Sequence, residues 1–429
     1  MVMSSALSIA LSGLRAAQTQ IETSSHNIAN VATEGYTRQR VDQRPTHPRT
    51  TIYGPMGAGV DVGDITRARD SWVDSRVRLT SGQAASLSVR TEMGQRTEDV
   101  LGEPDMGVTS SLGRLWSSFT ALSNNPSDDA ARTQVLSSLQ DFAGRATSVR
   151  QGLDSLTNDA QIRLGAEVDS ANKVADQIAS LNKLVPTQLS SDLADQRDLA
   201  IDKLAKSVGA TAVILPDGKA RVSVNGMALV DGDRVSHLSV DPNTPGVVNH
   251  PAGPAALGGT AGGLQSAITA DIPAYRARFD TFVTAAVTAL NSQHALGKTP
   301  AGTAGGPLLT DTPTSLSVAV TTTAQLAAAD TAGGAQNGQG AAAIASLRTV
   351  VDAAASTMIN GVGGDVANVS RSSDNASLLA NAASSARLSL TGVNIDEEMA
   401  QLISEQKAYA AAARIVTTVD QMLDSLVKM

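Results

Sequence analysis

The five histidines are the side chains of this sequence best suited to metal binding or proton transfer, and they are scattered along the chain. They occur in the segments HNIAN, HPRTT, HLSVD, HPAGP and HALGK, at His26, His47, His237, His250 and His294. None belongs to an HExxH motif, which places two zinc ligands and a general base on one face of a helix. The histidines therefore predict no zinc hydrolase.

Two acidic clusters and one glycine-rich segment are the other candidates for a chemical site. Asp128-Asp129 and Asp396-Glu397-Glu398 carry oxygen ligands for a cation, but each stands where a helical pattern begins. Acidic side chains cap helices and favour the positive end of the helix dipole, so capping is the preferred interpretation. GGAQNGQG, at 333–340, matches a phosphate-binding loop only loosely and follows no predicted strand, which favours a flexible linker.

Other motifs of catalysis are missing from the sequence. It contains no GxSxG elbow, no GxxxxGK[ST] loop and no cysteine, which excludes disulfides and thiolate metal sites. Trp72 and Trp116, the only tryptophans, are predicted to anchor the core. The sequence predicts a protein that is not an enzyme and needs no cofactor or metal.

The first thirty residues carry the apolar stripe of a helix that packs on other helices. Small or apolar residues recur at alternating steps of three and four. They are Leu7, Ala10, Leu14, Ala17, Ile21, Ser24, Ile28 and Val31. The pattern ends at TEGY, where Gly35 suits a left-handed turn.

The C-terminus repeats this pattern over about 396–427, after a predicted cap at Asn394 or Asp396. The stripe consists of Met399, Leu402, Gln406, Tyr409, Ala413, Val416, Asp420, Leu423 and Val427, widened by Ile403 and Ala410. Asp420 interrupts it. The two similar chain ends are predicted to meet.

Between these ends the chain is mostly helical. Helical patterns cover 69–93, 108–122, 128–185, 264–296 and about 341 onwards, with Pro186 predicted to stop the third. From Ala210 the period changes to two, and TAVILPDGKARVSVNGMALVDG predicts short strands with turns at Asp217-Gly218 and Asn225-Gly226. Loops are predicted at 297–313 and 332–340, with one strand at 314–323.

The fold class is therefore mainly α, with paired, coiled-coil-like terminal helices, a body of long helices and small β insertions. The predicted division is 1–65 with 380–429 as a terminal helical domain, and 66–209 with 264–379 as the body. Residues 210–263 form a β-rich insertion, and a second short β or loop segment lies near 298–337.

Composition limits the possible partners. Of 429 residues, 42% are hydrophobic but only 2% aromatic, which suits Ala-rich helical packing. The net charge of -8 argues against binding nucleic acid through its phosphates. No run approaches the roughly 18 apolar residues of a membrane helix, so no membrane insertion is predicted. The apolar segment at 6–14 lacks a preceding Lys or Arg, so we expect no cleaved signal peptide.

The opening segment SGLRAAQTQIETSSHNIANVATEGYTRQR resembles the N-terminal signature of bacterial flagellar axial proteins, the family of rod, hook and hook-associated proteins. The shared elements are Ser12-Gly13-Leu14, Asn27-Ile28-Ala29-Asn30 and Gly35-Tyr36. Where the family usually has proline before this glycine, the chain has Glu34.

Four further segments resemble the hook-associated protein 1 branch of that family, whose members join hook to filament. They are NNPSDDAARTQVLSSLQDFAGRATSVRQGLDSL, GKARVSVNGMALVDG, GGLQSAITADIPAYRARFDTFVTAAVTALNSQHALG and GVNIDEEMAQLISEQKAYAAAARIVTTVDQMLDSLVKM. With the N-terminal signature they reach from Ser12 to Met429.

The resemblance implies a structural protein that forms a ring at the hook–filament junction and allows the filament to assemble. The implied partners are further copies of the chain, hook protein, a second hook-associated junction protein next to the filament, and a cytoplasmic type III export chaperone. The chain would be cytoplasmic before export and would then be secreted into the flagellum with its N-terminus intact.

The resemblance also places the functional residues on the two terminal helices. The assembly interface is expected at Leu7, Leu14, Ile21 and Ile28, and the family turn motif at Asn27, Ile28, Ala29, Asn30, Gly35 and Tyr36. The C-terminal interface, for assembly and for the chaperone, is expected at Leu402, Ile403, Tyr409, Val416, Leu423 and Val427. Since a helix without a local partner is marginal, we expect both terminal helices to be frayed until neighbouring copies bury them.

Two alternatives stay open at this stage. Another axial component, a rod or hook subunit, should have a β-rich middle, which the helical patterns contradict. A secreted enzyme on a flagellar-type scaffold would need a metal or nucleophile site in 210–263, where only His237 and His250 occur and suitable partners are missing.

Overall fold

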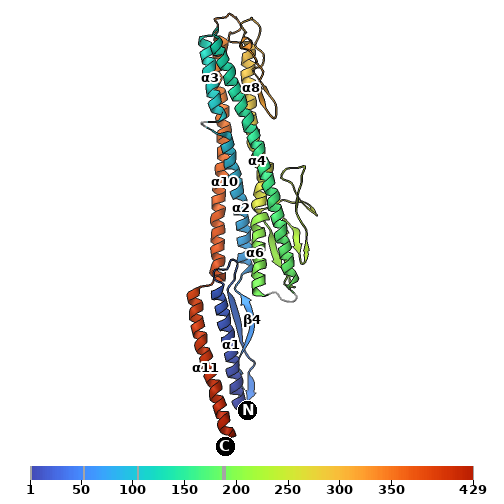
Figure 1. Ribbon diagram of the computed structural model, residues 1–429, viewed down its shortest axis with the longest axis vertical. Helices are drawn as coiled ribbons and strands as arrows, with labels where there is room; N and C mark the ends of the chain where they lie inside the picture. The colour runs from blue at the N-terminus through green and yellow to red at the C-terminus, as the bar shows by residue number, and fades with distance from the viewer. Residues whose placement is uncertain (1, 52–53, 104–105, 186–189, 429) are drawn as a thin grey trace.

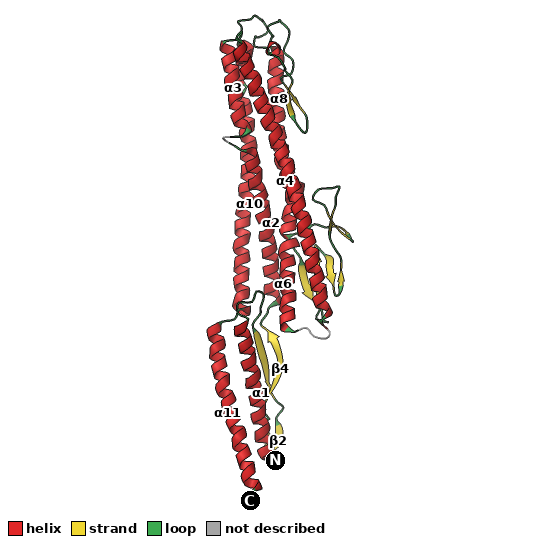
Figure 2. Ribbon diagram, in the orientation of Figure 1, coloured by secondary structure: helices red, strands yellow, loops and turns green. Residues whose placement is uncertain are grey.

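The molecule is elongated, with the two chain termini side by side at one end (Figure 1). The computed structural model describes residues 2–51, 54–103, 106–185 and 190–428. Long helices dominate and short strands lie at their sides, so the predicted mainly α fold with small β segments is confirmed (Figure 2).

The terminal domain, as we name it, consists of two long helices and a β hairpin. Helix α1 (Val2–Ala29) packs along α11 (Ile395–Val427). Strands β1 (Gln39–Pro45) and β4 (Val60–Arg67) pair antiparallel and pack on α1, and the smaller pair β2 (Arg49–Thr51) and β3 (Gly54–Met56) lies between them in sequence.

The β1–β4 hairpin was not predicted. Its strands expose residues on both faces, β1 having only Gln39 buried, so the alternation of apolar and polar residues that marks a half-buried strand is missing. The hairpin is held by α1 and by its own pairing.

The body, as we name the rest, is a bundle of helices. They are α2 (Ser71–Leu101), α3 (Val108–Asn124), α4 (Asp129–Lys183), α6 (Ser191–Val208), α7 (Gly259–Ser266), α8 (Ile272–Leu296), α9 (Gln339–Ser346) and α10 (Arg348–Thr391). Of these, α2, α4, α8 and α10 are much longer than the helices of an average globular domain. The 55 residues of α4 span about 80 Å. The predicted stop at Pro186 lies outside the described residues.

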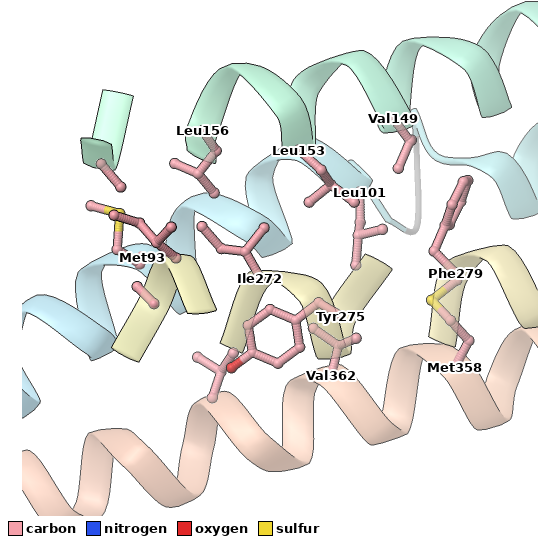
Figure 3. Close-up of a cluster of buried hydrophobic side chains, with 14 of the residues drawn as sticks. Met93, Leu101, Val149, Leu153, Leu156, Ile272, Tyr275, Phe279, Met358 and Val362 are labelled. Carbon is pink, nitrogen blue, oxygen red and sulfur yellow. The ribbon is translucent and has the colours of Figure 1, made fainter. Parts of the chain in front are cut away.

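The body core is a continuous layer between α2, α4, α8 and α10. Figure 3 shows part of it, where side chains from all four helices converge. The labelled residues are Met93, Leu101, Val149, Leu153, Leu156, Ile272, Tyr275, Phe279, Met358 and Val362. Burial of each large apolar side chain in this layer contributes roughly 1.5–3 kcal/mol to the stability of the body. A π-helical turn, Ala267–Asp271, joins α7 to α8.

The predicted β insertion is present. Strands β5 (Thr211–Ile214), β6 (Ala220–Val224), β7 (Met227–Asp231) and β8 (Arg234–Val235) form one antiparallel sheet. The turn between β6 and β7 has positive φ at both Asn225 (46°) and Gly226 (80°), as a two-residue hairpin turn requires. A smaller sheet follows, made of β9 (Ser239–Val240), β10 (Val248–His250) and β11 (Gly253–Pro254).

The second β segment differs from the prediction in its bounds. The single strand predicted at 314–323 is only β13 (Leu316–Val318), followed by a short 3-10 turn at Thr323–Gln325. Strand β13 pairs with β12 (Leu309–Asp311), which lies in a stretch predicted as loop. A three-residue strand is too short to show an alternation of apolar and polar residues in the sequence. Only its hydrogen-bonded pairing with another strand identifies it.

Other expectations need correction. Trp116 is buried, but Trp72 is 66% exposed and lies under the guanidinium of Arg76, so it anchors no core. Helix α10 runs unbroken to Thr391, and the chain bends at 392–394, whereas the predicted domain boundary at 380 falls inside this helix. The predicted meeting of the chain ends is confirmed, since α1 and α11 pack on each other. That both helices are frayed until neighbouring copies bury them stays a prediction.

Candidate functional site

The predicted stripe on α1 divides by side-chain size. Its small members Ala10, Ala17 and Ser24 are buried. Its large members Leu7, Leu14, Ile21 and Ile28 are only half-buried, and Val31 is exposed beyond the helix end. Small residues permit close approach of α1 to its neighbours, while the large ones keep apolar surface in contact with solvent.

The apolar side chains of helix α11 are also incompletely buried. Leu402 and Val416 are half-buried, while Ile403, Tyr409 and Leu423 are exposed at 48%, 38% and 39%. Val427 ends the helix, and its side chain is outside the described set. The structure therefore places the predicted C-terminal residues on one helix but covers only some of them.

The phase of the C-terminal stripe was partly wrong. Val419 is buried, with only 3% of its surface exposed, and the predicted stripe position next to it, Asp420, is exposed. The face turned towards the chain follows Glu398, Leu402, Glu405, Ala412, Val416 and Val419, in steps that fit a helix. The predicted stripe and the observed face share Leu402 and Val416. The sequence alone does not show which of the two faces packs on the chain.

Further large apolar side chains of the terminal domain are exposed on both helices. They are Ile9, Leu11, Ile395, Met399, Ile415 and Met422. Together they form an apolar surface on the terminal domain that the single chain leaves in contact with solvent.

Ser12 of the Ser-Gly-Leu element holds the hairpin on α1. Its hydroxyl oxygen accepts from Val60 N at 3.2 Å. The facing Gly59 has φ of +108°, and a Cβ there would come within 2.3 Å of the Ser12 oxygen. Only glycine fits this crossing, which brings the return strand against the helix.

Asn27 is the centre of the family turn motif and is 1% exposed. Its Oδ1 accepts from Gln39 N (2.9 Å) and from the Tyr36 hydroxyl (2.8 Å). Its Nδ2 donates to Gln39 O (3.0 Å) and to Glu398 Oε2 (3.1 Å). One amide side chain thus uses four hydrogen bonds to join α1, the turn, β1 and α11.

Glu398 is a buried carboxylate, 2% exposed, in the first turn of α11. Besides Asn27, it accepts from Arg38 Nε at 2.7 Å, and the backbone N of Arg38 donates to Thr391 O at 2.9 Å. Asn394, not Asp396, caps α11. The acidic cluster therefore lies in the first turn of α11, at the positive end of the helix dipole, but does not cap it, and the capping interpretation also misses the role of Glu398 in joining the chain ends.

The remaining motif residues shape the turn after α1. Gly35 has φ of +80° as predicted, although α1 has already ended at Ala29, which is exposed. Asn30 donates back to His26 O at 3.0 Å. Tyr36 is half-buried, and its hydroxyl lies 2.9 Å from His26 Nδ1. Burial raises the pKa of Tyr36, and Asp192, Asp195 and Glu398 raise it further, so its hydroxyl stays protonated as a donor.

The turn is seated on a row of acids along α6. Thr37 N donates to Asp195 Oδ2 (2.9 Å), and Gln39 Nε2 donates to Asp192 Oδ1 (3.1 Å). Asp195 and Asp198 also bind the guanidinium of Arg67 at 2.8 and 2.7 Å. These contacts join the terminal domain to the body.

Three further arginines complete this joint. Arg69 pairs with Asp74 and Asp198, and Asp202 receives Arg78 (2.7 Å) and Arg387 (2.6 Å). Sequence reasoning missed the whole cluster. The signal was an acidic row at steps of three and four, Asp192, Asp195, Asp198 and Asp202, which places four carboxylates on one helix face.

The described residues contain no group of three or more His, Asp or Glu side chains arranged to hold a metal ion. Asp128 caps α4 by accepting from Ala130 N, as predicted. The stretch Gln339–Ser425 includes a window that is long and apolar enough for a membrane span, but water-soluble helical proteins also have such windows. The absence of membrane insertion stays a prediction.

Comparison with known protein families gives separate matches for the body and for each of the two chain ends. Residues 94–309, half of the chain, match the family described as "Flagellar hook-associated protein FlgK helical domain". The chain belongs to this family. Residues 7–37 match the flagella basal body rod protein family, and 384–429 match the C-terminal family of basal body rod FlgEFG proteins. The motif residues Asn27 and Tyr36 lie in the first of these terminal matches and Glu398 in the second.

Individual FlgK-family relatives show the same likeness. Flagellar hook-associated protein 1 of Bacillus subtilis is 28% identical, over 98% of this chain and 97% of that protein. The Salmonella typhimurium protein of the same name is 28% identical, over 71% of this chain and 59% of its own length. The solved structure of the flagellar hook junction protein FlgK from Burkholderia pseudomallei is similar with TM-score 0.51 and 25% identity. That match covers 55% of this chain and 46% of the other.

The family result makes the chain a flagellar hook-associated protein and a component of the flagellum. It also decides between two expectations, because the body match is to FlgK and not to a rod or hook subunit. Relatives named as hook-associated proteins favour a structural role, and the lack of catalysis stays a prediction.

Proposed function

We propose that this protein is a structural joint between hook and filament, in which copies pack side by side into a ring through their terminal domains. The single observation that carries the proposal is the incomplete burial of the terminal helices. Leu7, Leu14, Ile21 and Ile28 on α1, with Ile403 and Leu423 on α11, keep apolar surface exposed in the single chain. Neighbouring helices in a ring would cover it.

The same kind of surface continues from α11 onto the lower half of α10. Leu378, Leu379, Leu388 and Leu390 are exposed, and the only charged side chain at 375–390 is Arg387, which turns inward to Asp202. A charge-free face on an exposed helix is unusual, because exposed helical surfaces are normally charged. We propose that neighbouring copies also cover this face.

The proposed partners along the axis are hook protein on one side and a second hook-associated protein on the other. The similar protein from B. pseudomallei is a hook junction protein, which supports this placement. Before secretion through the type III pathway, a cytoplasmic chaperone would bind the exposed side chains of α11, since an amphipathic helix fits an apolar groove.

The test of the junction function is a clean deletion strain. We expect hooks to form and filament subunits to appear in the medium instead of polymerising. Restoring the gene should restore filaments. Filaments of normal length in the deletion strain would exclude the junction role.

A second measurement tests the chaperone. Removal of residues 393–429 should abolish co-purification of the export chaperone with the chain, while the body remains folded by circular dichroism. Equal recovery with the shortened chain would place the chaperone site elsewhere.

A further inference from the structure

We infer that Glu398 couples the docking of α11 to the ordering of the β1–β4 hairpin, so that the N- and C-terminal segments become ordered together. The inference concerns how the terminal domain completes itself and does not depend on the proposed ring.

The first argument is the source of the partners of Glu398. Its carboxylate is 2% exposed, and the side chains that bind it are Asn27, at the end of α1, and Arg38, just before β1. A buried carboxylate is stable only when it is paired and hydrogen-bonded. Helix α11 therefore docks in this position only when the N-terminal segment has presented both donors.

The second argument runs in the opposite direction. Asn27 binds both backbone groups of Gln39, the first residue of β1, and the same amide nitrogen that donates to Gln39 O also donates to Glu398. Without α11, this nitrogen loses one of its two acceptors, and the Arg38 guanidinium loses the buried carboxylate that it pairs with. The start of β1 is therefore held less firmly when α11 is away.

A backbone contact strengthens the link. Arg38 N donates to Thr391 O at 2.9 Å, so the residue before β1 is also tied to the last residue of α10, where the chain bends towards α11. Coupling between two binding events is reciprocal. Any partner that holds the C-terminal segment away from α1 will loosen the hairpin as well.

The test is hydrogen exchange followed by mass spectrometry on the full chain carrying Glu398→Ala. The matched control is Glu397→Ala, which removes the same charge from the neighbouring position, where the side chain is 61% exposed and 3.5 Å from Arg38. We expect at least tenfold faster exchange in 39–45 and 60–67 for Glu398→Ala, with α4 unchanged. The control should match the unmodified chain.

The reciprocal arm uses Asn27→Ala, which should speed exchange in the first turns of α11. Adding Glu398→Ala to Asn27→Ala should speed hairpin exchange by less than Glu398→Ala does alone, because the bond from Asn27 to Glu398 is then already broken. Faster exchange confined to α11 in Glu398→Ala, with the hairpin unaffected, would overturn the inference. An equal increase in α4 would also overturn it, since the change would then weaken the whole chain. Should Glu398→Ala fail to fold, Glu398→Gln, which removes the charge paired with Arg38, is compared with Glu397→Gln, and a smaller increase confined to the same two segments is expected.

Discussion

The body and the terminal domain are both built from long helices rich in alanine, yet they bury their apolar side chains to different degrees. In the body, Leu112, Leu139, Phe142 and Leu164 are fully buried. In the terminal domain the buried apolar residues are mostly small, and its large ones are half-buried or exposed. The body therefore completes its own core, and the terminal domain holds its shape through a buried polar cluster while its large apolar side chains keep contact with solvent.

The difference in packing between the two regions is tested most directly by a substitution in the body. Phe142→Ala removes a fully buried ring from α4, and we expect a loss of about 3–5 kcal/mol in the free energy of unfolding. Urea unfolding followed by circular dichroism measures it. Leu423→Ala, at 39% exposure, is the matched change in the terminal domain and should cost far less. Equal losses would mean that the two regions are packed alike.

The polar joint should be the most sensitive point of the terminal domain. Asn27→Asp keeps an acceptor for Gln39 N and the Tyr36 hydroxyl but removes both donors and faces Glu398 with a second carboxylate. Leaving buried groups unsatisfied costs roughly 1–3 kcal/mol. Limited proteolysis should show early cleavage in the hairpin while the melting temperature of the body stays unchanged.

The control for this change is Asn30→Asp, in the same motif but half-buried. Its smaller expected effect follows from water reaching its partners. If both variants resist protease as the unmodified chain does, the joint contributes little to the terminal domain.

Acid should act on the body through His294. This residue is 1% exposed; its Nδ1 donates to Gly306 O (2.6 Å), and its Nε2 accepts from Ala327 N (2.8 Å). Burial lowers the pKa of His294 below that of the unfolded chain, against a smaller raising effect of the Gly306 carbonyl. The neutral ring is therefore favoured in the fold.

The resulting stability is fully present above the unfolded pKa of about 6.5 and is lost as pH falls from there towards the folded pKa, by at most about 1.4 kcal/mol per pH unit. Melting of the body between pH 7.5 and 5 measures this loss. His294→Gln should reduce the pH dependence, and His237→Gln, at an exposed position, should not. The same slope for both variants would assign the acid sensitivity to other groups.

The smallest effect on the single chain is expected at the exposed apolar residues. Leu423→Asp should change the melting temperature by little, because the side chain is already in contact with water, but a carboxylate facing a neighbouring helix should prevent incorporation into the junction. Ser425→Asp adds the same charge on an exposed polar position nearby and should still assemble. Filaments of normal length with Leu423→Asp would remove this position from the interface.

Leu14→Asp sharpens the same comparison. Leu14 is half-buried between Ala10 and Ala17, so its exchange for a charge should loosen α1 from α11 as well as block assembly. If the terminal helices were instead frayed in the free chain, as the sequence predicts, this change would leave hydrogen exchange in α11 unaltered. Faster exchange in α11 of the variant indicates that α1 and α11 are packed together in the free chain.

Much of the helical fold could be predicted because its signals are local. The caps at Asp128 and Asn394 act on amides two residues away, and the Asn225-Gly226 turn needs only its own backbone angles. Apolar periodicity located α3 and α4 within a few residues. The family motif could also be recognised in the sequence, but the hydrogen bonds that each of its residues makes could not be predicted.

What only the tertiary structure decided are the contacts between distant segments. Asn27 and Glu398 are 371 residues apart in the chain, and nothing in the spacing around either residue indicates the other. The hairpin, the seating of the turn on α6 and the phase of the face that α11 turns to α1 depend on the same meeting of chain ends. The sequence by itself determined the helices, whose hydrogen bonds close within four residues. The joint needed the fold, because its donors and acceptors become neighbours only after those helices have packed.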